Sequence, residues 1–319
     1  MENRNKILEV NHLKKYFQTP AGLLHAVDDV SFSIDQASTL GVVGESGCGK
    51  STLGRTVLRL KEPTEGEILF HGQDIVKASK KEQRRIRPRM QMIFQDPYSS
   101  LNGRMTVSQL IEEPLIVNKV CGRSEREDRV QEVMKTVGLA ERLSMSYPHE
   151  LDGGRRQRIG IARALVLDPE FIVCDEPVSA LDVSIQAQIL NLLMDLQEER
   201  KLTYMFITHD LSVVKHISNE IMVMYLGKCV EKADSEELFR NPLHPYTKAL
   251  LAAIPIPSIE SCHKKRTLLQ GEVTSPVDPK PGCRFASRCP YASAACREED
   301  MELREVSKGH FTACPYVGS

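Results

Sequence analysis

Alternating and continuous apolar segments divide the chain into stretches of different character. Within residues 7–43, ILEVNHL, HAVDDVSFSI and TLGVVG alternate or run apolar at strand length, and GEILFHG is typical of a further strand. From residue 159 to 229, helical spacing alternates with the short apolar runs FIVCDE, YMFITHD and IMVMYLG. This alternation predicts a parallel sheet covered by helices, and therefore an α/β fold.

Two other stretches depart from this pattern. Residues 106–146 show helical spacing in VSQLIEEPL and REDRVQEVMKTVGL, which predicts a helical insertion. After residue 240 the chain becomes proline-rich, which predicts a linker followed by an irregular tail. We therefore expect one large domain over residues 1–240, with a helical subdomain at about 100–160, and a C-terminal extension over residues 241–319.

Composition narrows the class of protein. The formal net charge of −1 over 319 residues argues against general nucleic-acid binding. No run approaches the roughly 18 apolar residues of a membrane span, and the start MENRNKILEV lacks the apolar core of a signal peptide. The basic run KKEQRRIRPR is interpreted as a solvated face rather than as a contact for lipid or nucleic acid. These features predict a cytoplasmic chain that reaches a membrane only through a partner.

A glycine-rich loop joins a predicted strand to a predicted helix. GESGCGKST fits the pattern G-x-x-x-x-G-K-[ST], follows TLGVV and precedes LGRTVLRL. In such a loop backbone N–H groups cradle phosphates, the lysine reaches the β and γ phosphates, and the following serine can ligate Mg²⁺. Cys48 is interpreted as a tolerated small residue rather than a nucleophile. The predicted phosphate loop consists of Gly44, Glu45, Ser46, Gly47, Cys48, Gly49, Lys50, Ser51 and Thr52.

Two acidic residues end an apolar strand in FIVCDEP. A carboxylate at such a strand tip can hold Mg²⁺ through water, which is the role predicted for Asp175. Its neighbour Glu176 can then orient or deprotonate an attacking water. Acids often end strands at solvent, so the glycine loop is what gives this pair a functional interpretation.

The motifs follow one another in the order found in ABC-type ATPases. The glycine loop, IFQDP, ELDGGRRQRIGIARAL, CDEP, SALD and ITHD cover roughly residues 7–240, and as a set they resemble that family. The resemblance implies a P-loop NTPase (ABC ATPase) core with an antiparallel β subdomain and a helical insertion. It also implies ATP and Mg²⁺ as cofactors, and two ATPase subunits that pack head to tail.

The same resemblance implies roles for single residues. Tyr16 is implied to stack on adenine, with Phe17 as its nearest rival and a core aromatic as the alternative. Gln95 is implied to sense Mg²⁺ and the attacking water while it touches the membrane partner. The resemblance implies that His209 binds the γ-phosphate and that Ser179 and Asp182 lie at the dimer interface. It implies Ser51 and Gln95 as the Mg²⁺ ligands. The implied catalytic residues are Lys50, Gln95, Glu176 and His209.

One motif differs from the family pattern. The family sequence LSGGQ begins with a serine whose hydroxyl and following N–H groups bind the γ-phosphate of the other subunit. This chain has Asp152, Gly153, Gly154 and Arg155 at the corresponding positions. Aspartate caps a helix as well as serine does, but two unit charges about 4 Å apart repel by roughly 4 kcal/mol at an effective dielectric constant near 20. The difference predicts a heterodimer with unequal sites, unless Arg155 neutralises Asp152.

The C-terminal extension carries a second resemblance. NPLHPYTKALLAAIP followed by four cysteines is similar to the ATP-binding subunits of peptide and nickel importers, and most similar to the F-type ATPase of oligopeptide or dipeptide permeases. The cysteines are separated by five, six and seventeen residues, without the tight pairs usual for zinc, and four thiolates also suit an iron–sulfur cluster. The resemblance implies a [4Fe-4S] cluster, with Zn²⁺ or uncoordinated thiols as alternatives, at Cys283, Cys289, Cys296 and Cys314.

The leading interpretation is an ATP-hydrolysing subunit that energises an importer of oligopeptides or dipeptides from the cytoplasmic face of the plasma membrane. The implied partners are a homologous ATPase subunit with an intact signature, two membrane permease subunits and an extracellular substrate-binding protein, without nucleic acid. Nickel or oligosaccharide import is the alternative. A soluble ABC ATPase would usually need two cassettes or a long coiled coil, and an export ATPase would normally be fused to membrane spans or lack this tail.

Overall fold

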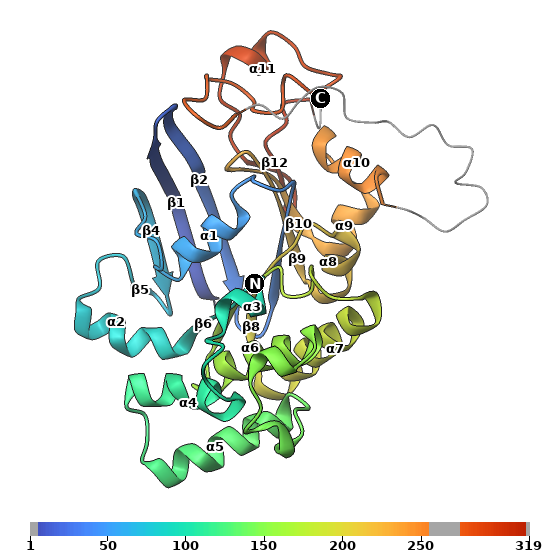
Figure 1. Cartoon of the computed structure of the whole chain (residues 1–319). Coiled ribbons are helices and arrows are strands. Elements are labelled where there is room, and N and C mark those ends of the chain that lie inside the picture. Colours follow the sequence, from blue (N-terminus) through green and yellow to red (C-terminus); the bar gives the residue numbers. More distant parts are fainter. Residues whose placement is uncertain (1–5, 255–274, 317–319) are drawn as a thin grey trace, which may run out of the picture. The chain divides into compact units, whose positions relative to one another are not determined.

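The computed structural model describes residues 6–254 and 275–316. The chain forms two compact units. Unit 1 is built mainly from Phe70–Phe206, and unit 2 mainly from Leu8–Ser33, Thr39–Leu69 and the chain from Ile207 onward. Both units combine helices with β-sheet, so the predicted α/β class is confirmed (Figure 1).

Unit 2 holds two groups of paired strands. In the first, β2, β1 and β4 are neighbours in that order. In the second, β3 pairs in parallel with β9, β9 pairs antiparallel with β10, and β12 pairs antiparallel with β10 and β11. The strands are β1 (Lys6–Thr19), β2 (Gly22–Asp35), β3 (Thr39–Val43), β4 (Glu65–Phe70), β9 (Glu220–Tyr225), β10 (Lys228–Asp234), β11 (Arg304–Ser307) and β12 (His310–Thr312).

The helices of unit 2 pack against the second group of strands. Helix α8 contacts β3, and α9 contacts β9 and β10. The apolar core between them includes Tyr225, Tyr246 and Phe285, all with side chains at most 1% exposed. The helices are α1 (Lys50–Val57), α8 (Leu211–Ile217), α9 (Ser235–Arg240), α10 (Pro245–Ala252) and α11 (Ala295–Glu298).

Unit 1 contains the second parallel pair and most of the helices. Strand β7 pairs in parallel with β6 and is flanked by β8. Helix α6 contacts β6, α4 and α5, which together give the predicted helical insertion its core. The elements are β5 (Gln73–Asp74), α2 (Lys80–Ile86), β6 (Met90–Ile93), α3 (Pro97–Ser100), α4 (Val107–Asn118), α5 (Arg123–Thr136), α6 (Gly153–Leu165), β7 (Phe171–Asp175), α7 (Val183–Arg200) and β8 (Thr203–Ile207), with 3-10 turns at Arg87–Arg89, Glu141–Leu143 and Pro148–Glu150.

The C-terminal extension is more regular than the sequence predicted. Helix α10 begins at Pro245. Proline is favourable at the first helical position because a backbone N–H there would have no acceptor within the helix. The His244 imidazole caps the helix by accepting from the Tyr246 N–H at 3.1 Å. Strand β12 pairs with β10 through Glu231 and Thr312. The prediction of an irregular tail was therefore wrong for these segments, because distant strand pairing leaves no local signal.

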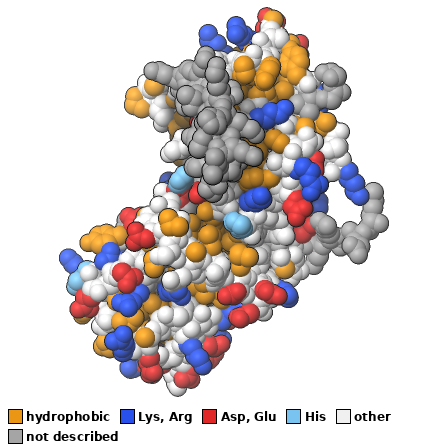
Figure 2. All heavy atoms as spheres, turned by 90° about the vertical axis from the view of Figure 1, so that its right-hand side faces the viewer, with side chains coloured by type: hydrophobic (Ala, Val, Ile, Leu, Met, Phe, Trp, Pro, Cys, Tyr) orange, Lys and Arg blue, Asp and Glu red, His pale blue; other side chains and the backbone are white. Residues whose placement is uncertain are grey.

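Surface composition agrees with the balanced net charge. On the face shown in Figure 2, acidic and basic side chains are interspersed. Within the described ranges, no helix is long and apolar enough to cross a membrane.

Candidate functional site

The phosphate loop lies in unit 2, between β3 and α1, where the sequence placed it. Gly44 and Gly49 adopt positive φ angles of 154° and 105°. A Cβ atom at Gly44 would lie 2.2 Å from the Met224 carbonyl oxygen, and one at Gly49 would lie 2.0 Å from that of Ala26. Both positions therefore require glycine because neighbouring backbone approaches too closely for a side chain.

Lys50 is held inside this loop. Its side chain is 5% exposed, and its Nζ donates to the carbonyl oxygens of Gly44 at 2.8 Å and Glu45 at 3.0 Å. Cys48 is also buried, and burial raises the pKa of its thiol. A protonated, enclosed thiol agrees with the interpretation of Cys48 as a packing residue.

Tyr16, the predicted adenine contact, lies on β1. Its ring stacks on the His25 imidazole with centroids 4.0 Å apart, and its hydroxyl donates to Asp28 Oδ1 at 2.5 Å. Burial, followed by the hydrogen bond to Asp28, raises the pKa of Tyr16, so the hydroxyl remains a donor. The neighbouring Phe17 ring lies instead under the Lys15 ammonium group. The role of Tyr16 toward adenine stays a prediction.

His209, the predicted γ-phosphate ligand, also belongs to unit 2. The Thr208 N–H before it donates to the Val42 carbonyl oxygen at 3.1 Å, so the turn carrying His209 is fixed beside the end of β3. The His209 side chain is exposed. His209 therefore follows directly after a residue hydrogen-bonded to β3, the strand that precedes the phosphate loop.

Unit 1 brings Gln95 and Glu176 together. Strand β7 ends at the fully buried Asp175, and Glu176 follows it with a φ angle of 47°. A left-handed conformation at a residue other than glycine costs of order 1 kcal/mol or more and is typical of functional positions. Gln95 Nε2 donates to Glu176 Oε2 at 2.9 Å, and Ser179 Oγ donates to the Glu176 carbonyl oxygen at 3.1 Å. The Glu176 carboxylate therefore has a fixed direction.

The signature segment begins α6, also in unit 1. Asp152 Oδ1 accepts the Arg155 N–H at 2.8 Å, which confirms that aspartate caps this helix. The Arg155 Nε lies 3.5 Å from Asp152 Oδ2, and the two side chains are 48% and 60% exposed. Exposed pairs of this kind contribute about 0–1 kcal/mol to stability, and whether Arg155 neutralises Asp152 toward a nucleotide stays a prediction. A Cβ at Gly154 would lie 2.8 Å from Ile185 Cγ2, so glycine allows α7 to approach. Asp182, predicted for the dimer seam, precedes α7 as its N-cap.

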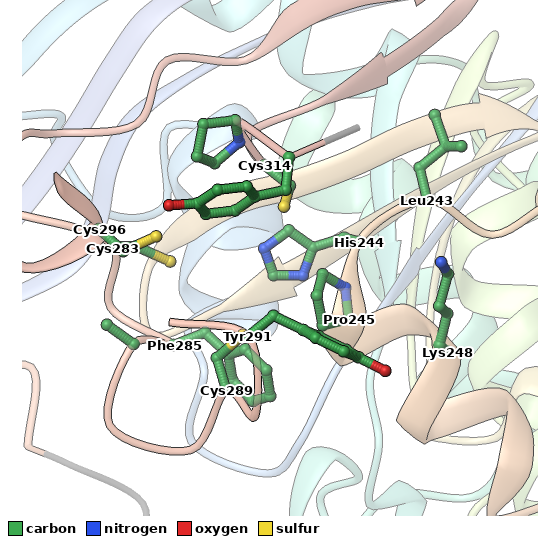
Figure 3. Close-up of a pocket in the computed structure, with 13 residues that line it drawn as sticks. Leu243, His244, Pro245, Lys248, Cys283, Phe285, Cys289, Tyr291, Cys296 and Cys314 are labelled. Atoms are coloured by element: carbon green, nitrogen blue, oxygen red, sulfur yellow. The ribbon is translucent and has the colours of Figure 1, made fainter. Parts of the chain in front are cut away.

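The four cysteines of the extension line one cavity of about 300 Å³, together with His244 and residues of α10 (Figure 3). All four are free thiols, and the Cys283 N–H donates to the Cys296 carbonyl oxygen at 2.7 Å. Burial raises the pKa of Cys283 to about 11 and also raises the pKa values of Cys289 and Cys314. Among the residues that the structure describes, no three metal-ligating side chains converge on a single ion. A further cysteine, Cys262, lies outside the described residues.

Two arginines of the extension were not predicted from the sequence. Arg284 donates to Asp28, the acceptor of the Tyr16 hydroxyl, and Arg288 donates to Glu45 of the phosphate loop. Asp28 and Glu45 lie 256 and 243 residues away along the chain, so local patterns carried no signal for either contact.

Comparisons with known proteins agree with this arrangement. A family model described as ABC transporter matches residues 27–179, and one described as Oligopeptide/dipeptide transporter, C-terminal region, matches residues 230–296. The oligopeptide transport ATP-binding protein AppF of Bacillus subtilis (strain 168) is 52% identical, with 98% of each chain covered. OppF of the same organism is 52% identical over 97% of this chain and 96% of that protein. A solved dimer of the ATP-binding cassette MJ0796 bound to ADP and Pi is 29% identical, has a TM-score of 0.66, and covers 72% of this chain and 98% of its own.

The fold and the phosphate loop, with these matches, define an ABC-type ATPase that couples ATP hydrolysis to transport. The chain belongs to the family of oligopeptide transport ATP-binding proteins, the ATPase subunits of ABC peptide transporters.

Proposed function

We propose that this chain hydrolyses ATP to drive the import of oligopeptides or dipeptides through a membrane permease. The observation that carries the cargo assignment is similarity over nearly the whole chain, including the peptide-transporter C-terminal region at residues 230–296. Nickel and oligosaccharide import gain no comparable support from the relatives described above.

The residues of the chain divide the chemistry between them. Glu176, oriented by Gln95, accepts the proton of the attacking water as the water adds to the γ-phosphorus and the bond to ADP breaks. Lys50 leaves the carbonyls of Gly44 and Glu45 to pair with the β and γ phosphates. Ser51 and Gln95 would hold Mg²⁺, with Asp175 reaching it through water, and the ion would neutralise phosphate charge. His209 completes the γ-phosphate contacts.

The ATPase works as a head-to-tail pair with unequal sites. The solved cassette dimer similar to this chain supports the pairing. The Asp152 carboxylate stands at the N-terminus of α6, at the position where an intact signature offers a neutral hydroxyl to the partner's nucleotide. A partner with an intact signature therefore forms a working site with Lys50 and Glu176 of this chain.

The membrane partner docks beside Gln95, at the cytoplasmic face of the plasma membrane. A groove of about 90 Å³ in unit 1 is lined by Phe94, Pro114, Gln157 and Arg163. Phe94, the neighbour of Gln95 in the chain, lines this groove, which supports the docking of a permease segment there. The substrate-binding protein acts on the other side of the permease.

The extension binds a [4Fe-4S] cluster through its four cysteines. The four thiols line one cavity of about 300 Å³, although among the described residues no group of three metal-ligating side chains is arranged to hold an ion. Four cysteine thiolates are the usual ligands of a [4Fe-4S] cluster. The proposal rests on these four sulfur donors at one cavity and on the resemblance of this tail to the tails of peptide-importer ATPases.

Uptake by cells tests the cargo. Cells that lack this chain should lose uptake of labelled trialanine, and the wild-type chain should restore it while the Glu176→Gln variant does not. Uptake of labelled nickel serves as the control and should be the same in all strains. Loss of nickel uptake with trialanine uptake intact would overturn the peptide assignment.

A further inference from the structure

Two arginines of the C-terminal extension reach different parts of the nucleotide-binding region of unit 2. Arg284 and Arg288 flank Phe285, whose ring packs 5.3 Å from Tyr225 and 5.4 Å from Tyr246, centroid to centroid. Because this ring is buried in the core of the unit, the segment between Cys283 and Cys289 is anchored there.

Arg288 holds Glu45, the second residue of the phosphate loop. Its Nη1 donates to Glu45 Oε2 at 2.8 Å and its Nη2 donates to Oε1 at 3.1 Å. The arginine side chain is 7% exposed, so water screens this pair much less than a surface pair. A two-point arginine–carboxylate contact fixes direction as well as distance.

Glu45 is also held through its backbone. Its N–H donates to the Tyr246 hydroxyl at 2.9 Å, and its carbonyl oxygen accepts from Lys50 Nζ at 3.0 Å. Tyr246 lies on α10, so Glu45 is contacted by two separate segments of the extension, one carrying Tyr246 and the other carrying Arg288. The position of Glu45 therefore sets the position of the loop that carries Lys50.

Arg284 acts on the other half of the region. It donates to the Leu226 carbonyl oxygen and to Asp28 Oδ2, and its side chain is 6% exposed. Asp28 Oδ1 accepts the Tyr16 hydroxyl, while Asp28 Oδ2 lies 3.3 Å from His25 Nδ1, the ring on which Tyr16 stacks. Arg284 thus fixes the carboxylate that orients Tyr16.

We propose that Arg288 and Arg284 are positioning residues for ATP, through which the extension sets the affinity of the chain for nucleotide. Arg288 acts on the triphosphate through Glu45, and Arg284 acts on the base through Asp28 and Tyr16. The proposed role of Arg284 rests on the predicted contact of Tyr16 with adenine, whereas the proposed role of Arg288 does not. Neither contact depends on the cargo.

The test measures dissociation constants of the purified full-length chain for ATP and, by competition, for sodium tripolyphosphate. Arg288→Met should weaken both about tenfold, because a charge-assisted pair is lost. Arg284→Met should weaken ATP to a similar extent and leave tripolyphosphate unchanged. The control is Arg297→Met, an exposed arginine of the same extension, which should change neither.

A double-mutant cycle separates positioning from general stability. If Arg288 acts through Glu45, Arg288→Met should have little further effect in a Glu45→Gln background, and Arg288→Lys should recover part of the affinity. Should Arg288→Met fail to fold, as judged by its melting temperature, Arg288→Lys and Glu45→Gln carry the same cycle. ATP affinity equal to wild type in folded variants, or equal losses with and without Glu45, would overturn the proposal and leave peptide import untouched.

Discussion

Gln95 Nε2 donates to Glu176 Oε2 at 2.9 Å, joining the end of β6 to the end of β7. The two strands pair in parallel, with Ile93 opposite Cys174, so both side chains follow the same edge of the sheet. An amide N–H that donates to a carboxylate oxygen fixes the direction of that carboxylate. The geometry therefore makes Gln95 the group that orients Glu176, which we propose as the general base.

Gln95→Ala should lower the kcat of ATP hydrolysis on the order of tenfold, because the Glu176 carboxylate loses its orienting hydrogen bond. Gln95→Glu serves as a second variant that places a like charge beside Glu176 and should lower kcat further. Steady-state hydrolysis in the assembled complex measures both. A kcat unchanged by Gln95→Ala would contradict the orienting role.

Asp152→Asn should raise the ATPase activity of the chain without a partner, since it removes the charge from the signature and keeps the helix cap. Asp152→Ser should act in the same way. The matched control is Arg155→Gln, which removes the counter-charge and should lower activity. Vigorous hydrolysis by the lone wild-type chain, unchanged by Asp152→Asn, would make Arg155 neutralisation the better explanation.

Protein purified without oxygen should be brown and contain about four irons per chain. Changing any one of Cys283, Cys289, Cys296 or Cys314 to serine should lower the iron content and the visible absorbance. Cys121→Ser is the control, because Cys121 lies outside the cavity. One zinc per chain and no iron, by metal analysis, would reject the cluster.

Phe285→Ala should lower the free energy of unfolding by about 3–5 kcal/mol, as expected when a buried aromatic is truncated. The Phe285 ring is 1% exposed and packs among the core aromatics of unit 2. Tyr291→Ala, in the same extension but 68% exposed, should change stability by about 0.5 kcal/mol or less. Urea titration of both variants measures the two losses, and a Phe285→Ala loss as small as that of Tyr291→Ala would show that the extension is not part of the core.

Local patterns were sufficient to predict the elements that local physics determines. The glycine loop between β3 and α1, the cap of α6 by Asp152 and the acidic end of β7 all follow from short sequence signals. The pairing of β12 with β10 and the contact of Arg288 with Glu45 do not, because each joins residues far apart in the chain. Only the folded core, with Phe285 inside it, brings these segments together.

We propose Glu176 as the general base of this ATPase, and the Glu176→Gln variant of the assembled transporter separates this role from a role in binding ATP. The variant should bind ATP as wild type does, while hydrolysis falls by a factor of about 100 or more. Lys50→Ala, in contrast, should weaken ATP binding itself. Hydrolysis by Glu176→Gln near the wild-type rate would show that Glu176 is not the general base.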